Sequence, residues 1–269
     1  MADELRIAIF GATGRMGRAL VTAVEECPNA VVSGASASAT SEWIGRELSA
    51  TGAKSKATVS KDPAGALQQA HVAIDFTLPE ATSANLAACV NARCPIVIGT
   101  TGQSDAVQIQ ISEASRSIPI LQAPNMSLGV NLLMQLVEVA ASKLDENYDI
   151  EIFEAHHRNK KDSPSGTALA LGRSAAAGRN VELQALAEHD RHGSNVPRRR
   201  GAIGFSVFRG GDVIGDHTVT FAGIGERIEL THRASDRMAF ARGAVTAAKW
   251  LVSRSPGLYS MRDVLALSR

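Results

Sequence analysis

Two adjacent histidines followed by lysines form the most reactive segment of the sequence. Residues 154–167 read EAHHRNKKDSPSGT, and His156 and His157 stand at the end of a strand-like stretch. Neighbouring side chains on a strand point to opposite faces, so the pair is poorly arranged to bind one metal ion. Histidine titrates near neutral pH and can donate a proton. We therefore expect no metal, one histidine at most as an acid, and the other binding or orienting a ligand.

A helix start follows these histidines. Asp162 or Ser163 is expected to cap the helix, with Pro164 in its first turn and the amides of Gly166 and Thr167 close by. A helix start with cationic neighbours binds a carboxylate. The segment therefore predicts a carboxylate pocket that carries a proton donor. The alternative is a capped surface helix with solvated basic residues.

A glycine-rich turn, GATGRMG, occupies residues 11–17, between an apolar stretch at 5–10 and a helical one at 15–26. Glycines let the backbone approach a pyrophosphate, and the amides of the helix start favour its negative charge. The spacing is GxxGxxG, where GxGxxG is the commoner form. Its position after the first strand favours a dinucleotide site over a simple packing turn.

Three further loops are expected at the same edge of the sheet, where ligands of such folds bind. They are 75–77 (DFT), 99–102 (GTTG) and 123–126 (APNM). Each offers small residues, hydroxyls or amides near where a nicotinamide would lie, although each alone is typical of an ordinary turn.

The acid that usually holds the adenosine ribose is missing. Residues 34–41 read GASASATS, and Glu42 is the first acid after them. Serine hydroxyls such as that of Ser38 can donate to a 2′-phosphate and do not repel it, and Arg15 or Arg18 could supply positive charge. We therefore expect NADPH to bind more tightly than NADH.

Short apolar stretches alternate with helical ones through the first half of the chain, which predicts a Rossmann-like, doubly wound parallel sheet in an α/β fold. The strands are expected at 5–10, 30–34, 71–76, 95–98 and 118–121, and the helices at 15–26, 79–91 and 105–116.

The second half has strands in succession, which indicates a separate α+β domain with a mixed, mostly antiparallel sheet, beginning near Asn125. The strands are expected at 148–154, 202–208, 212–221 and 226–232, the helices at 128–144, 164–177 and 236–252, and an exposed polar loop with a solvated Arg198–Arg199–Arg200 run at 188–201.

Composition excludes several classes of protein. The 269 residues carry 28 Lys+Arg against 27 Asp+Glu, and only 4% are aromatic, so nothing favours a nucleic-acid partner. The start, MADELRIAIF, is unlike a signal peptide, and no apolar stretch is long enough to span a membrane. Three sparse cysteines are expected to be buried and reduced. These features predict a cytoplasmic protein.

Several segments in the same order resemble dihydrodipicolinate reductase, the 4-hydroxy-tetrahydrodipicolinate reductase of lysine and diaminopimelate synthesis. They are GATGRMG, IDFTLPE, VIGTTG, NMSLGVN, EAHHRNKKDSPSGTA, RGGDVIGDHTVTFAGIGERIELTHRA and FARGAV. The resemblance runs through nearly the whole chain and is most specific around the two histidines. It implies an NAD(P)H-dependent oxidoreductase with a small dicarboxylate substrate.

The resemblance also implies roles for individual residues. His156 would be the proton donor and Lys160 a second donor, while His157, Gly166 and Thr167 would bind the substrate. The coenzyme, NADPH in preference to NADH, would be bound by Gly11, Ala12, Thr13, Gly14, Arg15, Met16, Ser38, Gly99, Thr100, Thr101, Ala123, Pro124, Asn125 and Met126.

The family pattern further implies a dinucleotide-binding domain at 1–126 and 241–269, a substrate-binding and oligomerisation domain at 127–240, and a homotetramer. The chain departs from the pattern twice: Asn159 replaces a histidine, and Ser38 stands in place of the ribose-binding acid. The first leaves His156, His157 and Lys160 intact, and the second concerns the choice of coenzyme.

Other functions fit less well. A short-chain dehydrogenase needs Tyr-x-x-x-Lys, but Ile152 follows Tyr148 and Asp263 follows Tyr259 at that spacing. A semialdehyde dehydrogenase needs a cysteine nucleophile, and none of the three cysteines has such a context. The remaining alternative is an NAD(P)H-binding sensor or scaffold without catalysis, which the intact segment from His156 to Lys160 disfavours.

Overall fold

The computed structural model describes residues 4–193 and 195–266. The chain forms two compact units, the first from Met1–Leu128 and Arg237–Arg269 and the second from Gly129–Asp236. The ends of the expected dinucleotide-binding domain, 1–3 and 267–269, and position 194 of the expected polar loop lie outside the described residues.

The first unit contains a parallel sheet of seven strands in the order β12-β6-β5-β4-β1-β2-β3, which confirms the doubly wound fold. Its inner strands are continuous apolar runs because helices cover both faces. The strands are β1 (Leu5–Phe10), β2 (Ala30–Ser36), β3 (Val59–Ser60), β4 (Val72–Asp75), β5 (Ile96–Ile98), β6 (Pro119–Gln122) and β12 (Gly257–Tyr259).

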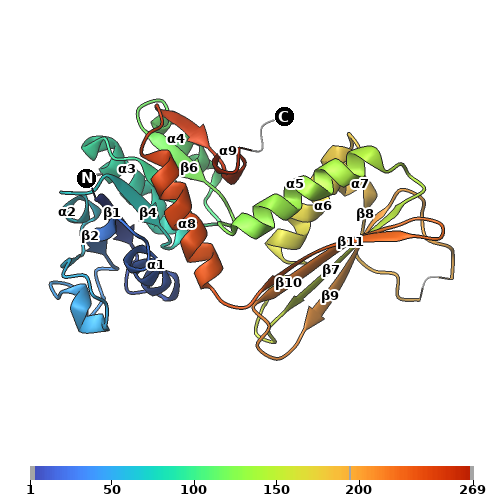
Figure 1. Ribbon diagram of the computed structural model, residues 1–269, viewed down its shortest axis with the longest axis horizontal. Coiled ribbons are helices and arrows are strands. Elements are labelled where there is room, and N and C mark those ends of the chain that lie inside the picture. The colour runs from blue at the N-terminus through green and yellow to red at the C-terminus, as the bar shows by residue number, and fades with distance from the viewer. Residues whose placement is uncertain (1–3, 194, 267–269) are drawn as a thin grey trace. The chain divides into compact units, whose positions relative to one another are not determined.

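Helices cover both faces of this sheet (Figure 1), and each face has its own hydrophobic core. On one face Ile7 and Ile9 of β1 pack with Leu20 of α1 and Ala244 of α8, and on the other Phe10 packs in the cluster that contains Ile111 of α4. The helical elements of the unit are α1 (Arg15–Glu25), η1 (Leu48–Thr51), α2 (Pro63–Ala66), η2 (Pro79–Ala81), α3 (Thr82–Ala92), α4 (Asp105–Ala114), α8 (Met238–Leu251) and α9 (Met261–Val264).

The second unit contains a mixed five-stranded sheet in the order β11-β10-β7-β9-β8. The pairs β10–β11 and β10–β7 are antiparallel, and β7–β9 and β8–β9 are parallel. The strands are β7 (Asp149–His156), β8 (Ala187–Glu188), β9 (Ile203–Arg209), β10 (Gly215–Ala222) and β11 (Arg227–Ala234).

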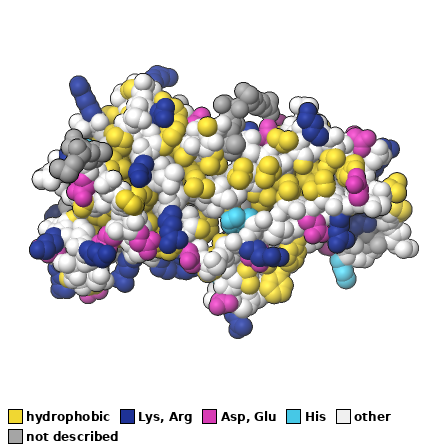
Figure 2. All heavy atoms as spheres, in the orientation of Figure 1, with side chains coloured by type: hydrophobic (Ala, Val, Ile, Leu, Met, Phe, Trp, Pro, Cys, Tyr) yellow, Lys and Arg dark blue, Asp and Glu magenta, His cyan; other side chains and the backbone are white. Residues whose placement is uncertain are grey.

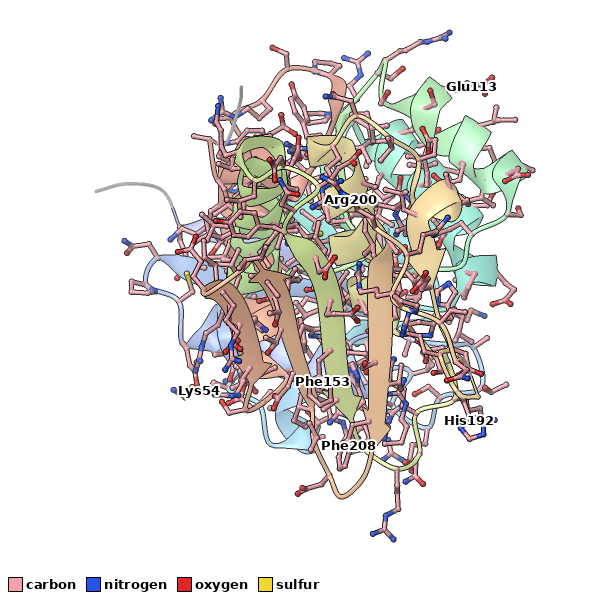
Figure 3. The ribbon with its side chains drawn as sticks, turned by 90° about the vertical axis from the view of Figure 1, so that its right-hand side faces the viewer. Lys54, Glu113, Phe153, His192, Arg200 and Phe208 are labelled. Carbon is pink, nitrogen blue, oxygen red and sulfur yellow. The ribbon has the colours of Figure 1, made fainter. Side chains whose placement is uncertain are left out.

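The helices of the second unit pack against one face of its sheet. They are α5 (Leu128–Lys143), α6 (Gly166–Gly178) and α7 (Leu183–Leu186). Leu171 and Ala175 of α6 share a buried cluster with Ile150 and Ile152 of β7. The other face carries two exposed phenylalanines, Phe153 and Phe208, on neighbouring strands (Figure 3).

Hydrophobic side chains also gather along α5 (Figure 2). Leu132, Leu136 and Val139 are 44%, 46% and 54% exposed, and their spacing places them on one side of the helix.

Two expectations about the second unit are wrong. Neither Asp162 nor Ser163 caps α6: the helix begins at Gly166, and the hydroxyl of Ser165 accepts from the amide of Ala168. Ser165 takes this place because its extended backbone (φ −64°, ψ 152°) suits a cap, so Pro164 precedes the helix.

Arg198 is not part of a solvated arginine run. Its side chain is 17% exposed and forms ion pairs with Asp149 and Glu151 of β7, both at 2.9 Å. It also donates to the carbonyl oxygens of Ile150 and Ala202. The arginine therefore ties the loop to the start of β7, a contact between segments that local sequence patterns do not reveal.

None of the helices within 4–193 and 195–266 is both long and apolar enough to cross a membrane.

Candidate active site

The glycine-rich turn joins β1 to α1 and leaves no room for side chains on its inner side. Gly11 has φ +78°, and the amides of Gly11 and Ala12 both donate to the carbonyl of Ser36. A Cβ at Gly17 would lie 2.0 Å from the carbonyl oxygen of Gly11. The close approach of helix and turn therefore requires glycine at 17, as in a dinucleotide-binding turn.

A pocket of about 580 Å³ opens beside this turn, within the size range of ligand sites. Gly11, Thr13, Gly14, Arg15 and Met16 line one part of it, and Ser38 lines another. The expected turn residue Ala12 is buried with 1% of its surface exposed.

Basic side chains that could attract a phosphate lie near the pocket, but not all of them line it. Lys61, just after β3, is exposed and lines the same pocket as Ser38 and Arg15. Arg18 instead donates its Nε atom to the carbonyl of Thr13. The pocket therefore presents two cations, Arg15 and Lys61, beside a serine hydroxyl.

A buried carboxyl joins the loops that follow β4 and β5. Asp75 is 0% exposed, and its Oδ1 atom accepts from the amide and hydroxyl of Thr77 and from the hydroxyl of Thr100. Burial raises the pKa of Asp75 in spite of these hydrogen bonds. The acid thus holds the 75–77 loop and Thr100 together at the carboxyl edge of the sheet.

The remaining expected coenzyme residues lie around the ends of β5 and β6. Thr100, Thr101, Ala123 and Pro124 line one small recess. Three other expected residues are packed against their neighbours. A Cβ at Gly99 would lie 2.2 Å from the ring of Phe76, and Met126 is 1% exposed. The side chain of Asn125 accepts a hydrogen bond from the amide of Ser127 at 2.9 Å.

In the second unit, His156 at the end of β7 contacts a fully buried carboxylate. Its Nδ1 atom lies 2.6 Å from Oε2 of Glu154, two residues earlier on the same face of the strand. The side chains of His156 and Glu154 are 10% and 1% exposed. Burial lowers the pKa of His156, and the Glu154 carboxylate opposes that shift.

Glu154 also binds Arg209 and the start of α6. Arg209 of β9 donates Nη1 to Oε2 at 2.7 Å and Nη2 to Oε1 at 2.8 Å, and the amide of Ser165 donates to Oε1 at 2.9 Å. Burial alone would raise the pKa of Glu154, but the hydrogen bonds from Arg209, His156 and Ser165 hold it below its usual value. The carboxyl is therefore ionised at neutral pH.

The charge on Glu154 determines the tautomer of its neighbour. A carboxylate can only accept hydrogen bonds, so Nδ1 of His156 must donate, and Nε2 is the atom that gains or loses a proton. A Cβ at Gly215 would lie 3.1 Å from that Nε2 atom. Glycine at 215 therefore leaves space beside the reactive nitrogen.

The other expected residues of this site lie in the segment after β7. Lys160 forms an ion pair with Asp162 at 2.9 Å and is 21% exposed. The backbone amide of His157 donates to the carbonyl of Val213 at 2.7 Å. Gly166 and Thr167 are the first two residues of α6, where amides point out of the helix start.

A second buried imidazole, that of His217 on β10, lies next to His156. The ring centroids are 5.2 Å apart in an edge-to-face arrangement, and His217 Nε2 lies 3.1 Å from the hydroxyl of Ser165. Burial, together with the charge of His156, lowers the pKa of His217 to about 4. His217 is therefore neutral at pH 7, which limits positive charge beside His156.

Sequence reasoning missed three residues of these sites: Lys61, Glu154 and Arg209. Period-2 alternation along β7 places Glu154 on the face of His156, so a signal for that residue was present. Lys61 and Arg209 come from elements distant in the chain and had no local signal. His217 was expected to be structural or solvated, with a cleft as the alternative, and it lies beside His156.

Two protein-family models match the chain, one over each part of it. The family model described as "Dihydrodipicolinate reductase, N-terminus" matches residues 5–126, and "Dihydrodipicolinate reductase, C-terminus" matches residues 129–265. Two relatives are named 4-hydroxy-tetrahydrodipicolinate reductase. The one from Thiobacillus denitrificans is 50% identical over 98% of this chain and 99% of its own, and that from Pseudoalteromonas atlantica is 48% identical over 98% and 99%.

Solved structures show the same fold. A dipicolinate-bound dihydrodipicolinate reductase from Paenisporosarcina sp. TG-14 has a TM-score of 0.75 at 26% identity and covers 95% of this chain and 97% of its own. The protein GenD2 from gentamicin A biosynthesis, in complex with NAD, has a TM-score of 0.57 at 14% identity, over 99% of this chain and 92% of its own, which is a likeness of fold alone.

Proposed function

Because the chain belongs to the dihydrodipicolinate reductase family, we propose that its two units divide the work of one NAD(P)H-dependent reduction. The substrate is 4-hydroxy-tetrahydrodipicolinate and the product tetrahydrodipicolinate, a step of lysine and diaminopimelate synthesis. The unit of 1–128 and 237–269 binds the coenzyme, and the unit of 129–236 binds the dicarboxylate. The observation that carries this proposal is the contact of His156 with the ionised, buried Glu154 beside the start of α6.

The coenzyme supplies a hydride, and the residues of the first unit suit its binding. The glycine turn leads into the start of α1, where the amides of Arg15 and Met16 suit a pyrophosphate, and Ser38 lines the same pocket. We assign Gly99, Thr100 and Thr101 and the 123–126 loop to the nicotinamide end, with Asp75 holding Thr100 in place.

The second unit would bind the dicarboxylate and protonate it. The amides of Gly166 and Thr167 suit one carboxylate, and His157 and Lys160 add polar and cationic groups. The 4-hydroxyl group must leave as water, which gives the conjugated ring that accepts the hydride. Hydride addition to that ring then leaves negative charge on it, which a proton from Nε2 of His156 neutralises. A bound dianion favours the charged imidazolium and so opposes the effect of burial on the pKa of His156.

An assay of NADPH absorbance with 4-hydroxy-tetrahydrodipicolinate tests this function. Substrate-dependent loss of absorbance supports a reductase. Coenzyme binding without turnover would instead support a sensor or scaffold.

The choice of coenzyme follows from charge in the pocket beside the glycine turn. Ser38 stands where related folds carry an acid, and Lys61 and Arg15 line the same pocket. Cations and hydroxyls attract the 2′-phosphate of NADPH, whereas an acid repels it. We therefore propose that the enzyme prefers NADPH and also uses NADH.

Ser38→Glu is expected to reverse this preference. The new carboxylate would accept from the ribose hydroxyls of NADH and repel the NADPH phosphate, changing the ratio of dissociation constants by roughly 10–10²-fold. Fluorescence titration of both coenzymes measures the ratio, with Ser38→Ala as the uncharged control. Tighter NADH binding by the unmodified protein would contradict the proposal.

Lys61→Met tests the cation independently. It should weaken NADPH by roughly tenfold and leave NADH nearly unchanged, because only NADPH carries the phosphate. Equal weakening of both coenzymes would show that Lys61 does not act on that phosphate.

The homotetramer is also a proposal, supported by the uncovered face of the second sheet. Phe153 and Phe208 are 44% and 48% exposed there, and aromatic side chains are enriched at interfaces. Phe153→Glu should shift the mass measured by light scattering toward a smaller species, since a buried charge is costly. An unchanged mass in that variant would show that this face is not the interface.

A further inference from the structure

Four hydrogen bonds converge on the side chain of Glu154. Oε2 accepts from His156 and Arg209, and Oε1 accepts from Ser165 and Arg209, at 2.6–2.9 Å. A carboxylate has about four acceptor positions, so the group is fully satisfied. Its neighbours come from β7, β9 and the cap of α6.

Stability of the fold alone does not explain the charged groups of this cluster. A buried ion pair contributes little net stability compared with apolar residues of the same size, because both charges lose water. Here the carboxylate contacts the one nitrogen of His156 that is not the reactive one. Arg209 also donates to the carbonyl of Asp162 at 2.7 Å, which extends the cluster to the segment after Lys160.

We propose that Glu154 is a positioning residue for the reaction: it holds the His156 ring with Nε2 toward the substrate and fixes that ring relative to the amides of α6. The inference rests on the proposed function of His156 as the proton donor. Arg209 does not touch His156 and acts through Glu154, whose pKa its hydrogen bonds lower.

The charged surroundings of His156 determine the expected pH effects. Glu154 raises the pKa of His156, whereas burial, Lys160 and Arg209 lower it. The remaining titratable neighbour, His217, is neutral at pH 7 because its pKa is about 4. Removing the negative charge should therefore lower the pKa of His156, and removing the positive charge of Arg209 should raise it.

Glu154→Gln is the main test, because glutamine keeps the shape and removes the charge. All four partners of the carboxylate are donors, and the NH2 group of glutamine is also a donor, so one of these contacts becomes unfavourable. The hydrogen bond to Nδ1 of His156 therefore weakens. The pH at which kcat falls on the alkaline side of its profile should be lower by about 1 unit or more. At pH values above that fall, kcat should therefore be lower by at least roughly tenfold. KM should change less than kcat.

Arg209→Gln is the second variant. It leaves the contact between Glu154 and His156 in place and should move the same fall in kcat to higher pH. Glu151→Gln is the matched control, because Glu151 is another arginine-paired carboxylate on β7 and contacts Arg198 instead. That control should leave the pH profile in place.

Binding of dipicolinate gives a readout that does not depend on turnover. Calorimetry in buffers of different ionisation enthalpy counts the protons taken up when the dianion binds. Uptake by the unmodified protein should peak at a pH that falls in Glu154→Gln, and uptake should be lost in His156→Ala. A folded Glu154→Gln protein with unchanged kcat profile and unchanged uptake would overturn the role of Glu154.

The two proposals fail differently. If the unmodified protein neither binds dipicolinate nor consumes NADPH, the proposed function is wrong. If it does both, and neither Glu154→Gln nor Arg209→Gln moves the profile, the function stands and Glu154 is only structural.

Discussion

Replacing His156 with alanine is expected to lower kcat by roughly 10²–10⁴-fold, the range for loss of a positioned general acid. The loss should fall on kcat because the proton is needed after the hydride has arrived. NADPH affinity should change little, since the glycine-turn pocket is lined by residues of the other unit. Steady-state kinetics and coenzyme titration measure the two quantities.

His189 offers a control, because it is a histidine of the same unit that stacks on Phe205 and is not among the residues that hydrogen-bond to Glu154. His189→Ala should retain turnover. If His156→Ala remained active while Lys160→Ala was inactive, the roles of the two proposed donors would be reversed.

Gly166→Pro is expected to weaken substrate binding by roughly 10–10²-fold, the loss of one charge-assisted hydrogen bond. Proline removes the amide that we assign to a substrate carboxylate. The fold should tolerate it, because Gly166 opens α6, a position that proline favours, and a Cβ there meets no atom within 4 Å. The preceding Ser165 already has the extended backbone that proline requires.

Gly166→Ala is the matched control, since it adds a side chain and keeps the amide. Calorimetry with dipicolinate and the KM for substrate should separate the two variants, whereas NADPH should bind both alike. Similar dipicolinate affinities for the proline and alanine variants would show that this amide does not bind the ligand.

Much of the first unit could be predicted because its signals are local. Apolar runs such as Ile96–Ile98 form strands buried on both faces, and the turn from Gly11 to Gly17 needs backbone space that only glycine provides. The presence of a histidine shortly before a helix start, within residues 156–167, could also be predicted, because those residues are close together in the chain. The cap of that helix was predicted wrongly, because Asp162, Ser163 and Ser165 all suit the position and the contact of the Ser165 amide with Glu154 decides between them.

The sequence by itself therefore determined the class of fold, the glycine turn after the first strand and the segment in which His156 precedes a helix start, since each depends on residues close together in the chain. Only the tertiary structure decided what surrounds His156. Glu154 and Arg209 are 55 residues apart, and they meet because the parallel register of β7 and β9 places both side chains on one face. Register between distant strands depends on long-range packing, and so the contact of Arg209 with the carboxylate beside His156 is a property of the fold.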